Sequence, residues 1–281
     1  MVDITTIILT YNEEKNIEKC INSIKDISKK IIVVDSFSTD KTVEISKNLG
    51  AEVVCHDFIN QAQQFNWAIN NLEIKTDWIM RIDADEQLKE DALVEIENII
   101  TTNQDTDVNG LILQFEVVFL GKKIKHGGVY PKKDLRVFRK GFFATEQKNM
   151  DERSYLLSGK ALTVKSICIH NDYKDLTAWI DKHNKYSSRE VLDYIELKNT
   201  ENNYNHLTRQ ARVKRFLKNK IYYKLSMFFR AKLYYFYRYY LRGGFLDGKE
   251  GKFFCFLQAY WYRVLVDAKI YEYKKNNRDN I

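Results

Sequence analysis

The stretch Asp77-Trp-Ile-Met-Arg-Ile-Asp-Ala-Asp-Glu86 decides how the rest of the chain is interpreted. We take Trp78–Ile82 as an apolar, buried strand that ends in Asp83-Ala84-Asp85. Such a strand delivers two carboxylates at its carboxyl end. Oxygen ligands of this kind suit Mg²⁺ or Mn²⁺, which usually bridge substrate phosphates when they bind to proteins. The alternative is that the two aspartates only cap the following helix.

Three segments upstream also have the composition of buried strands, and each is followed by a helical pattern. The strands are Thr5–Leu9, Lys30–Val34 and Glu52–Cys55. The helices are expected near residues 17–24, 40–49 and 61–72. Continuous apolar strands that alternate with helices predict an α/β domain, in which helices cover both faces of a mostly parallel sheet.

Polar side chains follow three of these four strands at the point where each strand ends. Asn12 and Glu13 follow the first strand, Asp35 ends the second, and Asp83 and Asp85 end the fourth. Ligands of open parallel sheets bind beyond the carboxyl ends of the strands. The convergence of these ends favours a binding site over simple helix capping.

The remaining part of the body reads as further strands and helices. An apolar stripe predicts a helix over Glu90–Thr101, and a polar loop is expected at His126–Pro131. The other expected elements are strands over Gly110–Leu120, Leu135–Arg139 and Ala161–Cys168 and a helix over Asp175–Leu197.

The C-terminal part differs from the body in charge and in aromatic content. The chain has a formal net charge of +7, but residues 204–275 carry 17 Lys and Arg against 4 Asp and Glu, and 21 of the 38 aromatic residues. We expect two helices, at about His206–Leu241 and Lys249–Tyr271. Basic, aromatic, amphipathic helices suit an anionic membrane surface. The alternative is that their apolar faces pack on the body or on a second copy of the chain.

Composition excludes several other classes. The four cysteines form no Cys-x-x-Cys pair, which is typical of reduced thiols in a cytoplasmic protein. We expect no signal peptide, and the uncharged run Phe253–Tyr262 is too short to span a bilayer. No early strand is followed by Gly-x-Gly-x-x-Gly, which argues against a dinucleotide oxidoreductase. No motif predicts nucleic-acid binding.

The motifs together resemble those of family 2 glycosyltransferases of the GT-A fold, specifically bacterial enzymes that build lipopolysaccharide core and related surface glycans. The resemblance runs nearly end to end. It is carried by Thr10-Tyr-Asn-Glu-Glu14, Val34–Asp40, Gln64–Ala68, Asp77–Glu86, Arg136–Arg139, Lys182–Tyr186 and Gly243–Gly248.

The resemblance implies a nucleotide-sugar donor, expected to be a UDP-sugar, a glycan or glycolipid acceptor, and a divalent cofactor, Mg²⁺ or Mn²⁺. Asp85 would coordinate the metal, with Asp83 close to the ribose and the metal, and His170 is a further candidate ligand whose alternative is ordinary packing. Arg136 would face the diphosphate or else pair with surface acids. The residues expected to line the donor pocket are Tyr11, Glu13, Asp35, Gln64 and Asn66.

An inverting transfer also needs a carboxylate that takes the proton of the acceptor hydroxyl. We expect Glu152 to be this base, with Asp151 second, and a solvated charged turn as the alternative. Three positions depart from the family pattern. Phe37 stands where Gly is common, Phe65 where a basic residue is common, and Asp151 where relatives have His before Glu.

The resemblance also divides the chain. We expect a catalytic domain over residues 1–203, with a nucleotide-sugar half at about 1–105 and an acceptor half at about 106–203. A helical extension over 204–281 would associate with the cytoplasmic face of the inner membrane or form a homodimer. The rival functions are a sugar-1-phosphate nucleotidyltransferase and a non-catalytic binding module with the same fold.

Overall fold

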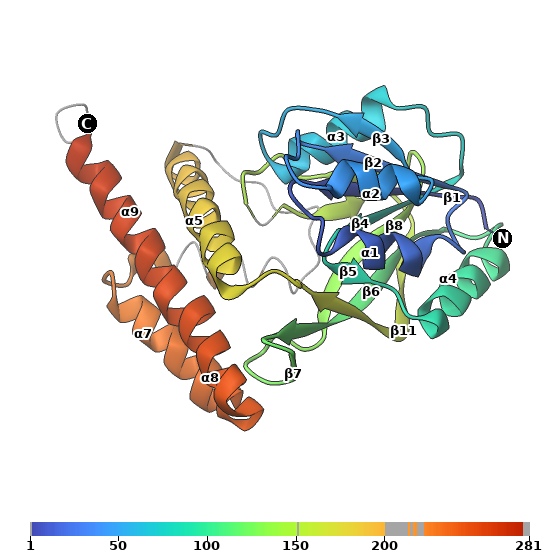
Figure 1. Cartoon of the computed structure of the whole chain (residues 1–281). Helices are drawn as coiled ribbons and strands as arrows, with labels where there is room; N and C mark the ends of the chain where they lie inside the picture. Colours follow the sequence, from blue (N-terminus) through green and yellow to red (C-terminus); the bar gives the residue numbers. More distant parts are fainter. Residues whose placement is uncertain (1, 151, 200–212, 214–215, 218–221, 278–281) are drawn as a thin grey trace. The chain divides into compact units, whose positions relative to one another are not determined.

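The computed structural model describes residues 2–150, 152–199, 213, 216–217 and 222–277. The chain forms two compact units (Figure 1). The first consists of Met1–Val118 and Pro131–Lys174, and the second of Phe119–Tyr130 and Asp175–Ile281. One boundary between the units thus falls at residue 175, where the helix that follows belongs to the second unit and packs on its C-terminal helix.

The first unit is built on four parallel strands in the order β3-β2-β1-β4. Thr10 is in register with Asp35, and Leu9 with Asp83, so the polar ends of three strands lie at one edge. This confirms the parallel arrangement predicted from the sequence. The bounds are Ile4–Thr10 for β1, Lys30–Asp35 for β2, Glu52–Cys55 for β3 and Trp78–Asp83 for β4.

The second half of the sheet is joined to the first by an antiparallel strand. β8 (Lys132–Arg139) is antiparallel to both β4 and β6 (Val108–Phe119). β11 (Lys160–Asn171) is parallel to β6 and antiparallel to the short β5 (Glu86–Gln87), and His170 lies opposite Glu86. This register brings the end of β11 to the acidic motif. The remaining strands are β7, β9 and β10. β7 (Lys122–Ile124) pairs with β6, and β9 (Phe143–Thr145) pairs with β10 (Ser154–Leu156) in a separate two-stranded sheet.

Helices cover both faces of this sheet (Figure 1). α1 (Ile17–Ile24), α2 (Thr42–Asn48) and α4 (Glu90–Thr102) pack on the face that carries Met80 and Ile82. α3 (Gln61–Asn71) packs on the opposite face, where Phe65 meets Ile79. The side chains of β4 therefore alternate between two apolar cores, as expected for a central strand.

β4 contains one charged residue that the prediction of an apolar strand overlooked. Arg81 is only 6% exposed, and its guanidinium carbon lies 5.2 Å from the centre of the Phe65 ring. Arg81 is two residues away from both Ile79 and Asp83 along the strand, so its side chain lies on their face. A buried cation needs a partner, which the site below supplies.

The second unit is helical. α5 (Leu176–Asn199) packs on α9 (Tyr262–Asn276) around Val191, Val266 and Ile270. The other elements are 3₁₀ turns at Tyr222–Lys224 and Gly244–Asp247, α7 (Phe229–Phe236), α8 (Gly248–Cys255) and π-helical turns at Tyr237–Leu241 and Phe256–Trp261.

The two predicted C-terminal helices have different outcomes. The second is confirmed, since residues 248–276 are helical throughout. The first is wrong as a continuous helix, because Phe228 has a φ of +63° and α7 begins only at Phe229. Buried Asp267 explains the break: its carboxylate accepts hydrogen bonds from the Phe228 N–H and from Arg230. The predicted start of that helix, residues 206–212, lies outside the described residues.

The Gly243–Gly248 motif has a structural role in the second unit. Buried Asp247 accepts hydrogen bonds from the His126 N–H and Nδ1, both at 2.8 Å. Gly127 donates its N–H to Arg242 O and accepts from Arg238 Nε. The loop around His126 is therefore fixed to the C-terminal helices. Among the described residues, no helix combines the length and hydropathy needed to cross a bilayer.

Candidate functional site

Three acidic residues at the end of β4 form the centre of the site, and we call Asp83, Asp85 and Glu86 the acid cluster. Glu86 is completely buried. Its carboxylate accepts a hydrogen bond from Arg136 at 2.6 Å and from the Asp83 N–H at 3.2 Å, and Lys132 Nζ lies 3.5 Å away. The second contact of Arg136 is the Asp83 carboxylate, at 2.8 Å. One guanidinium thus joins two members of the acid cluster.

The charges of this network fix its protonation. Burial alone would raise the pKa of Asp83, but the positive charges of Arg136, Arg81 and Lys132 outweigh burial and hold that pKa well below its usual range. Burial would likewise lower the pKa of Arg136, and the charges of Asp83 and Glu86 reverse this. Arg136 therefore pairs with the buried carboxylate of Glu86 and the part-buried carboxylate of Asp83, and Asp134 Oδ2 lies 3.9 Å away. Its expected contact with a diphosphate stays a prediction.

Asp85 and His170 face one another beside this network. Asp85 Oδ2 lies 3.6 Å from His170 Nε2, and the two side chains are 8% and 25% exposed. The backbone holds them there, because Asn171 donates its N–H to Asp85 O at 2.8 Å. His170 Nδ1 is buried and lacks a hydrogen-bond partner among the described residues, although Glu86 Oε1 lies 3.4 Å away.

This pair could hold one divalent cation after a small adjustment. Adjacent ligand atoms that are each about 2.1 Å from one octahedral ion lie roughly 3 Å apart, whereas Asp85 Oδ2 and His170 Nε2 are 3.6 Å apart. A metal-binding histidine usually directs its other ring nitrogen to a carboxylate, the position that Glu86 occupies. No set of three His, Cys, Asp or Glu side chains suited to a metal occurs in the described part of the chain. Substrate oxygens or water would complete the coordination.

The surroundings of Cys20 report the electrostatic potential at this edge. Burial, and then the negative charges of Glu86, Asp85 and Asp83, raise the pKa of the Cys20 thiol well above its usual value. Burial and Glu86 also raise the pKa of Cys168, to about 12. The carboxylates of the acid cluster thus act on the buried thiols beside them.

Glu152, the expected base, is joined to this network through Arg81. Arg81 Nη2 donates to Glu152 Oε1 at 2.9 Å, and both side chains are less than one tenth exposed. Arg81 Nε lies 3.9 Å from Asp83 Oδ1. Arg81 therefore has the partners that a buried cation in β4 requires. Asp151, the second candidate, lies outside the described residues.

The loops after β1 and β2 are bonded to each other. The Asp35 carboxylate accepts hydrogen bonds from the Thr10 hydroxyl and from the N–H and hydroxyl of Ser38, all between 2.6 and 2.7 Å. Asn12 donates its N–H to the Ser38 hydroxyl at 2.8 Å. Beside them Tyr11 is 49% exposed. These expected donor-binding residues therefore share one edge with the acid cluster.

Glu13 ties this edge to the end of β11. Its carboxylate accepts from Asn16 at 2.7 Å and pairs with Lys174 at 2.6 Å. Asn16 in turn donates to the Asp172 carboxylate at 2.9 Å. The contacts explain the position of Glu13 without a ligand, so its role toward the donor stays a prediction.

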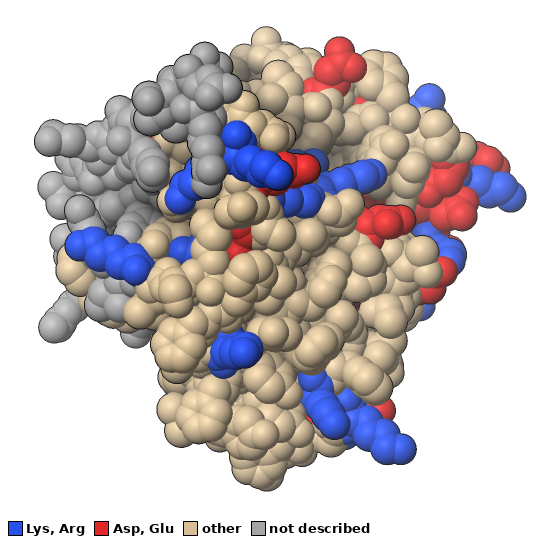
Figure 2. Space-filling view, turned by 90° about the vertical axis from the view of Figure 1, so that its left-hand side faces the viewer, with Lys and Arg blue, Asp and Glu red and all other residues tan. Residues whose placement is uncertain are grey.

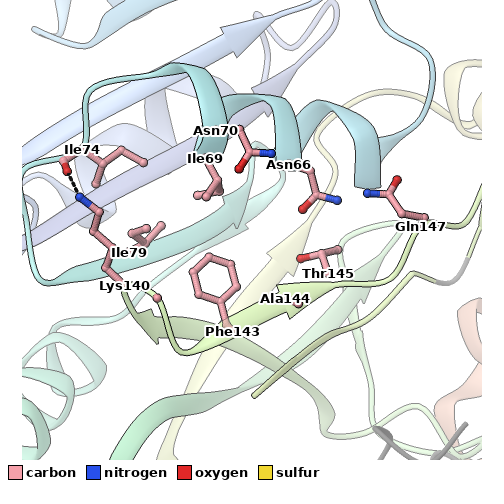
Figure 3. A pocket seen from close by; sticks show the side chains of 11 residues that line it. Asn66, Ile69, Asn70, Ile74, Ile79, Lys140, Phe143, Ala144, Thr145 and Gln147 are labelled. Carbon is pink, nitrogen blue, oxygen red and sulfur yellow. Dashed lines mark hydrogen bonds between the residues drawn. The ribbon is translucent and has the colours of Figure 1, made fainter. Parts of the chain in front are cut away.

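Gln64 and Asn66 occupy different surroundings on α3. Gln64 is 1% exposed, and its amide bonds to Ser36 and to His56, so it holds the ends of β2 and β3 in place. Asn66 faces Thr145 in a pocket of about 350 Å³ between α3 and β9 (Figure 3). Its Nδ2 is buried without a partner among the described residues. The acid cluster does not line this pocket.

Sequence reasoning missed several residues that the site depends on. Glu86 lay in the quoted motif without an assigned role, and Arg81 lay in a strand taken to be apolar. A charge inside an otherwise apolar strand is a usable signal, because it requires a buried partner. Lys132 gave no such signal, since its approach to Glu86 depends on how distant segments meet.

Replacing Arg136 with Met tests the charge network through its pH dependence. We expect the free energy of unfolding to fall by about 3 kcal/mol at about pH 7.5, because the buried Glu86 carboxylate and the part-buried Asp83 carboxylate lose a cation. In wild type, the lowered pKa of Asp83 adds to the free energy of unfolding above about pH 4, the pKa of an aspartate in the unfolded state. This contribution is lost only as the pH falls below that value. In the variant only Arg81 and Lys132 oppose burial, so the pKa of Asp83 rises and acidification to about pH 5 recovers part of the loss.

Urea denaturation of both proteins at the two pH values measures this difference. Arg139→Met is the matched control, because Arg139 lies on the same strand and donates to the backbone oxygens of Asn103 and Gln104. The free energy of unfolding of Arg139→Met should fall only slightly, and by the same amount at both pH values. An equally pH-independent loss for Arg136→Met would contradict the network.

Comparison with known proteins identifies the family of this chain. The sequence profile described as Glycosyl transferase family 2 matches residues 5–162. An uncharacterized glycosyltransferase of Rickettsia typhi is 30% identical over 204 residues, which are 70% of this chain and 69% of the relative. One from Rickettsia bellii is 32% identical over 204 residues, 69% and 68% of the two chains.

A solved structure extends the comparison to the fold. The mannosyltransferase PcManGT of Pyrobaculum calidifontis, in complex with GDP-Man and Mn²⁺, matches with a TM-score of 0.54 at 15% identity, over 96% of this chain and 87% of that one. This likeness concerns the fold alone, and it confirms the GT-A fold expected from the sequence. The chain is a glycosyltransferase that belongs to glycosyl transferase family 2.

Proposed function

We propose that this glycosyltransferase is an inverting, metal-dependent enzyme that moves a sugar from a nucleoside-diphosphate sugar to a glycan or glycolipid acceptor of the bacterial surface. The observation that carries the proposal is the approach of Asp85 to His170, at 3.6 Å, beside an Asp83 that Arg136 keeps ionised. UDP is the expected nucleotide from the family resemblance, whereas the structural neighbour binds GDP-Man and Mn²⁺.

Asp85 and His170 would hold the divalent cation, which supplies positive charge to the diphosphate as it leaves. Asp83, oriented by Arg136, would lie beside the ribose. Tyr11 and Asp35 would contact the nucleoside from the loops after β1 and β2. In this arrangement each end of the donor meets a group that is fixed by the protein before the substrate arrives, which lowers the cost of orienting it.

Glu152 would take the proton of the acceptor hydroxyl. The acceptor oxygen forms a bond to the anomeric carbon of the sugar as the bond from that carbon to the diphosphate oxygen breaks. The proton passes to the Glu152 carboxylate, and the nucleoside diphosphate departs with the bonding electrons. Arg81 fixes the position of Glu152 through its 2.9 Å contact.

A panel of UDP- and GDP-sugars with and without Mn²⁺ tests the donor class. We expect one nucleotide series to raise the melting temperature and to release its nucleoside diphosphate slowly, only when Mn²⁺ is present. Asp85→Asn should abolish the Mn²⁺-dependent part, because it removes a charged ligand. Asp77→Asn, at the opposite end of β4, is the matched control and should behave as wild type. Metal-independent binding of every nucleotide would refute the proposal.

Glu152→Gln tests the base. We expect donor affinity to stay at the wild-type value and turnover to fall by about a thousandfold, since general bases contribute roughly 10²–10⁴ in rate. Glu146→Gln, a similar change at a buried glutamate directly after β9, is the control and should keep most of the activity. Near-wild-type turnover of Glu152→Gln with an acceptor would remove Glu152 from the mechanism.

The second unit presents an apolar face that supports a lipid-bound acceptor. On α7 and the turn after it, the exposed positions are spaced as one helical face, while the buried positions include two arginines, Arg230 and Arg238. Arg230 pairs with Asp267, and Arg238 donates to Gly127 O and Gln258. The exposed members of this outer face are Phe229, Leu233, Phe236, Tyr237, Tyr240 and Leu241, with Phe245, Leu246, Phe253 and Phe256 beyond them.

Such a distribution is the reverse of an ordinary surface helix, where charges point outward. Figure 2 looks onto the side that carries these helices, and much of its lower part is uncharged, interrupted by separate Lys and Arg side chains. Lys232, Lys249 and Lys252 are exposed among the aromatic positions. Aromatic side chains flanked by lysines fit the interface of an anionic bilayer. We therefore propose that this outer face binds the surface of the membrane that carries the acceptor.

Liposome flotation measures this binding. Wild type should float with vesicles that contain anionic lipid and should remain below with neutral vesicles. Phe236→Ser, Leu241→Ser and Phe253→Ser combined should reduce the bound fraction at least about tenfold, because three apolar side chains no longer leave water. Leu157→Ser in the first unit is the control for an exposed apolar residue. The face would instead contact a second copy of the chain if wild type were a dimer that does not bind vesicles and the triple variant were a monomer.

A further inference from the structure

Phe37 combines two unfavourable features at the edge that carries the donor-binding loops. Its φ is +59°, a left-handed conformation that is a genuine outlier for a bulky side chain. Its side chain is also 56% exposed, so the ring does not stabilise the fold by burial. Glycine would adopt this backbone conformation without strain. The fold alone therefore gives no reason for a phenylalanine at this position.

The residues on both sides of Phe37 are held by hydrogen bonds that impose this conformation. Ser36 donates its N–H to Thr10 O at 2.9 Å, and Gln64 Nε2 donates to the Ser36 hydroxyl at 3.2 Å. Ser38 donates its N–H and its hydroxyl to the Asp35 carboxylate. The turn is thus rigid on each side, and it presents the aromatic ring to solvent.

The neighbouring loop presents a second ring in the same way. Asn12 has a φ of +53°, and it bonds to the Phe37 turn through the Ser38 hydroxyl and the Thr39 N–H, both at 2.8 Å. The preceding residue, Tyr11, is 49% exposed. Two exposed rings therefore stand on loops that are directly bonded, next to Asp35. Flat aromatic ligands stack on such rings, and nucleobases gain about 1–3 kcal/mol from each stacking partner.

We infer that Phe37 contacts the nucleobase of the donor, so that its ring covers one face of the base. This inference rests on the proposed function and adds a residue where the related family commonly has glycine. Stacking depends little on which base is present, since every base has a π-face. Phe37 thus contributes affinity for uracil and guanine nucleotides alike, and discrimination between them is left to hydrogen-bonding groups.

Phe37→Gly tests the inference because it removes the aromatic ring and also removes the strain of the left-handed backbone conformation. We expect a melting temperature at least equal to that of wild type and a dissociation constant for UDP with Mn²⁺ about tenfold higher. Binding of inorganic pyrophosphate with Mn²⁺ should not change, because pyrophosphate has no base. Isothermal titration calorimetry gives both constants, and Phe37→Leu should weaken UDP binding without raising the melting temperature.

Leu120→Gly is the matched control. Leu120 has a φ of +49° and is 54% exposed, but it lies outside the loops after β1 and β2. It should gain or keep stability with unchanged nucleotide binding. Wild-type UDP affinity in Phe37→Gly would overturn the inference, as would an equal loss of pyrophosphate binding. Failure of wild type to bind UDP, GDP and pyrophosphate would instead overturn the proposed function, so the two failures are distinct.

Discussion

The carboxylate of Glu86 is completely buried, and the arrangement of the site depends on how its charge is balanced. An unpaired buried carboxylate costs several kcal/mol, so the Arg136 guanidinium must stay within reach of β5. The same guanidinium contacts Asp83 at the end of β4. The end of β4 and the start of β5 are therefore linked to the middle of β8 by one cation. The geometry of the acid cluster follows from this contact.

The network also separates the roles of the two aspartates in the Asp-x-Asp motif. Asp83 faces Arg136 and Arg81, whose charges outweigh the effect of burial on its pKa. Asp85 faces the imidazole of His170, a group that binds metals when neutral. The motif thus places one carboxylate against the arginines and the other against His170.

Much of the fold was predictable because it depends on local pattern. Apolar strands that alternate with helices gave β1 to β4 nearly to the residue, and parallel pairing then required Asp35 and Asp83 to share an edge. Contacts between distant segments carry no such pattern. The break before α7 depends on Asp267, which lies 39 residues beyond Phe228. The partners of Arg81 and Arg136, and the structural use of Gln64, depend likewise on tertiary contacts.

The central claim is that Asp85 and His170 hold a divalent cation against the donor diphosphate. Anomalous scattering from a crystal of the protein with UDP and Mn²⁺ tests it most directly. The account predicts a manganese peak about 2.1–2.3 Å from an Asp85 carboxylate oxygen and from His170 Nε2, with phosphate oxygens completing the shell. A manganese ion that is bound to the diphosphate but not to Asp85 would contradict it.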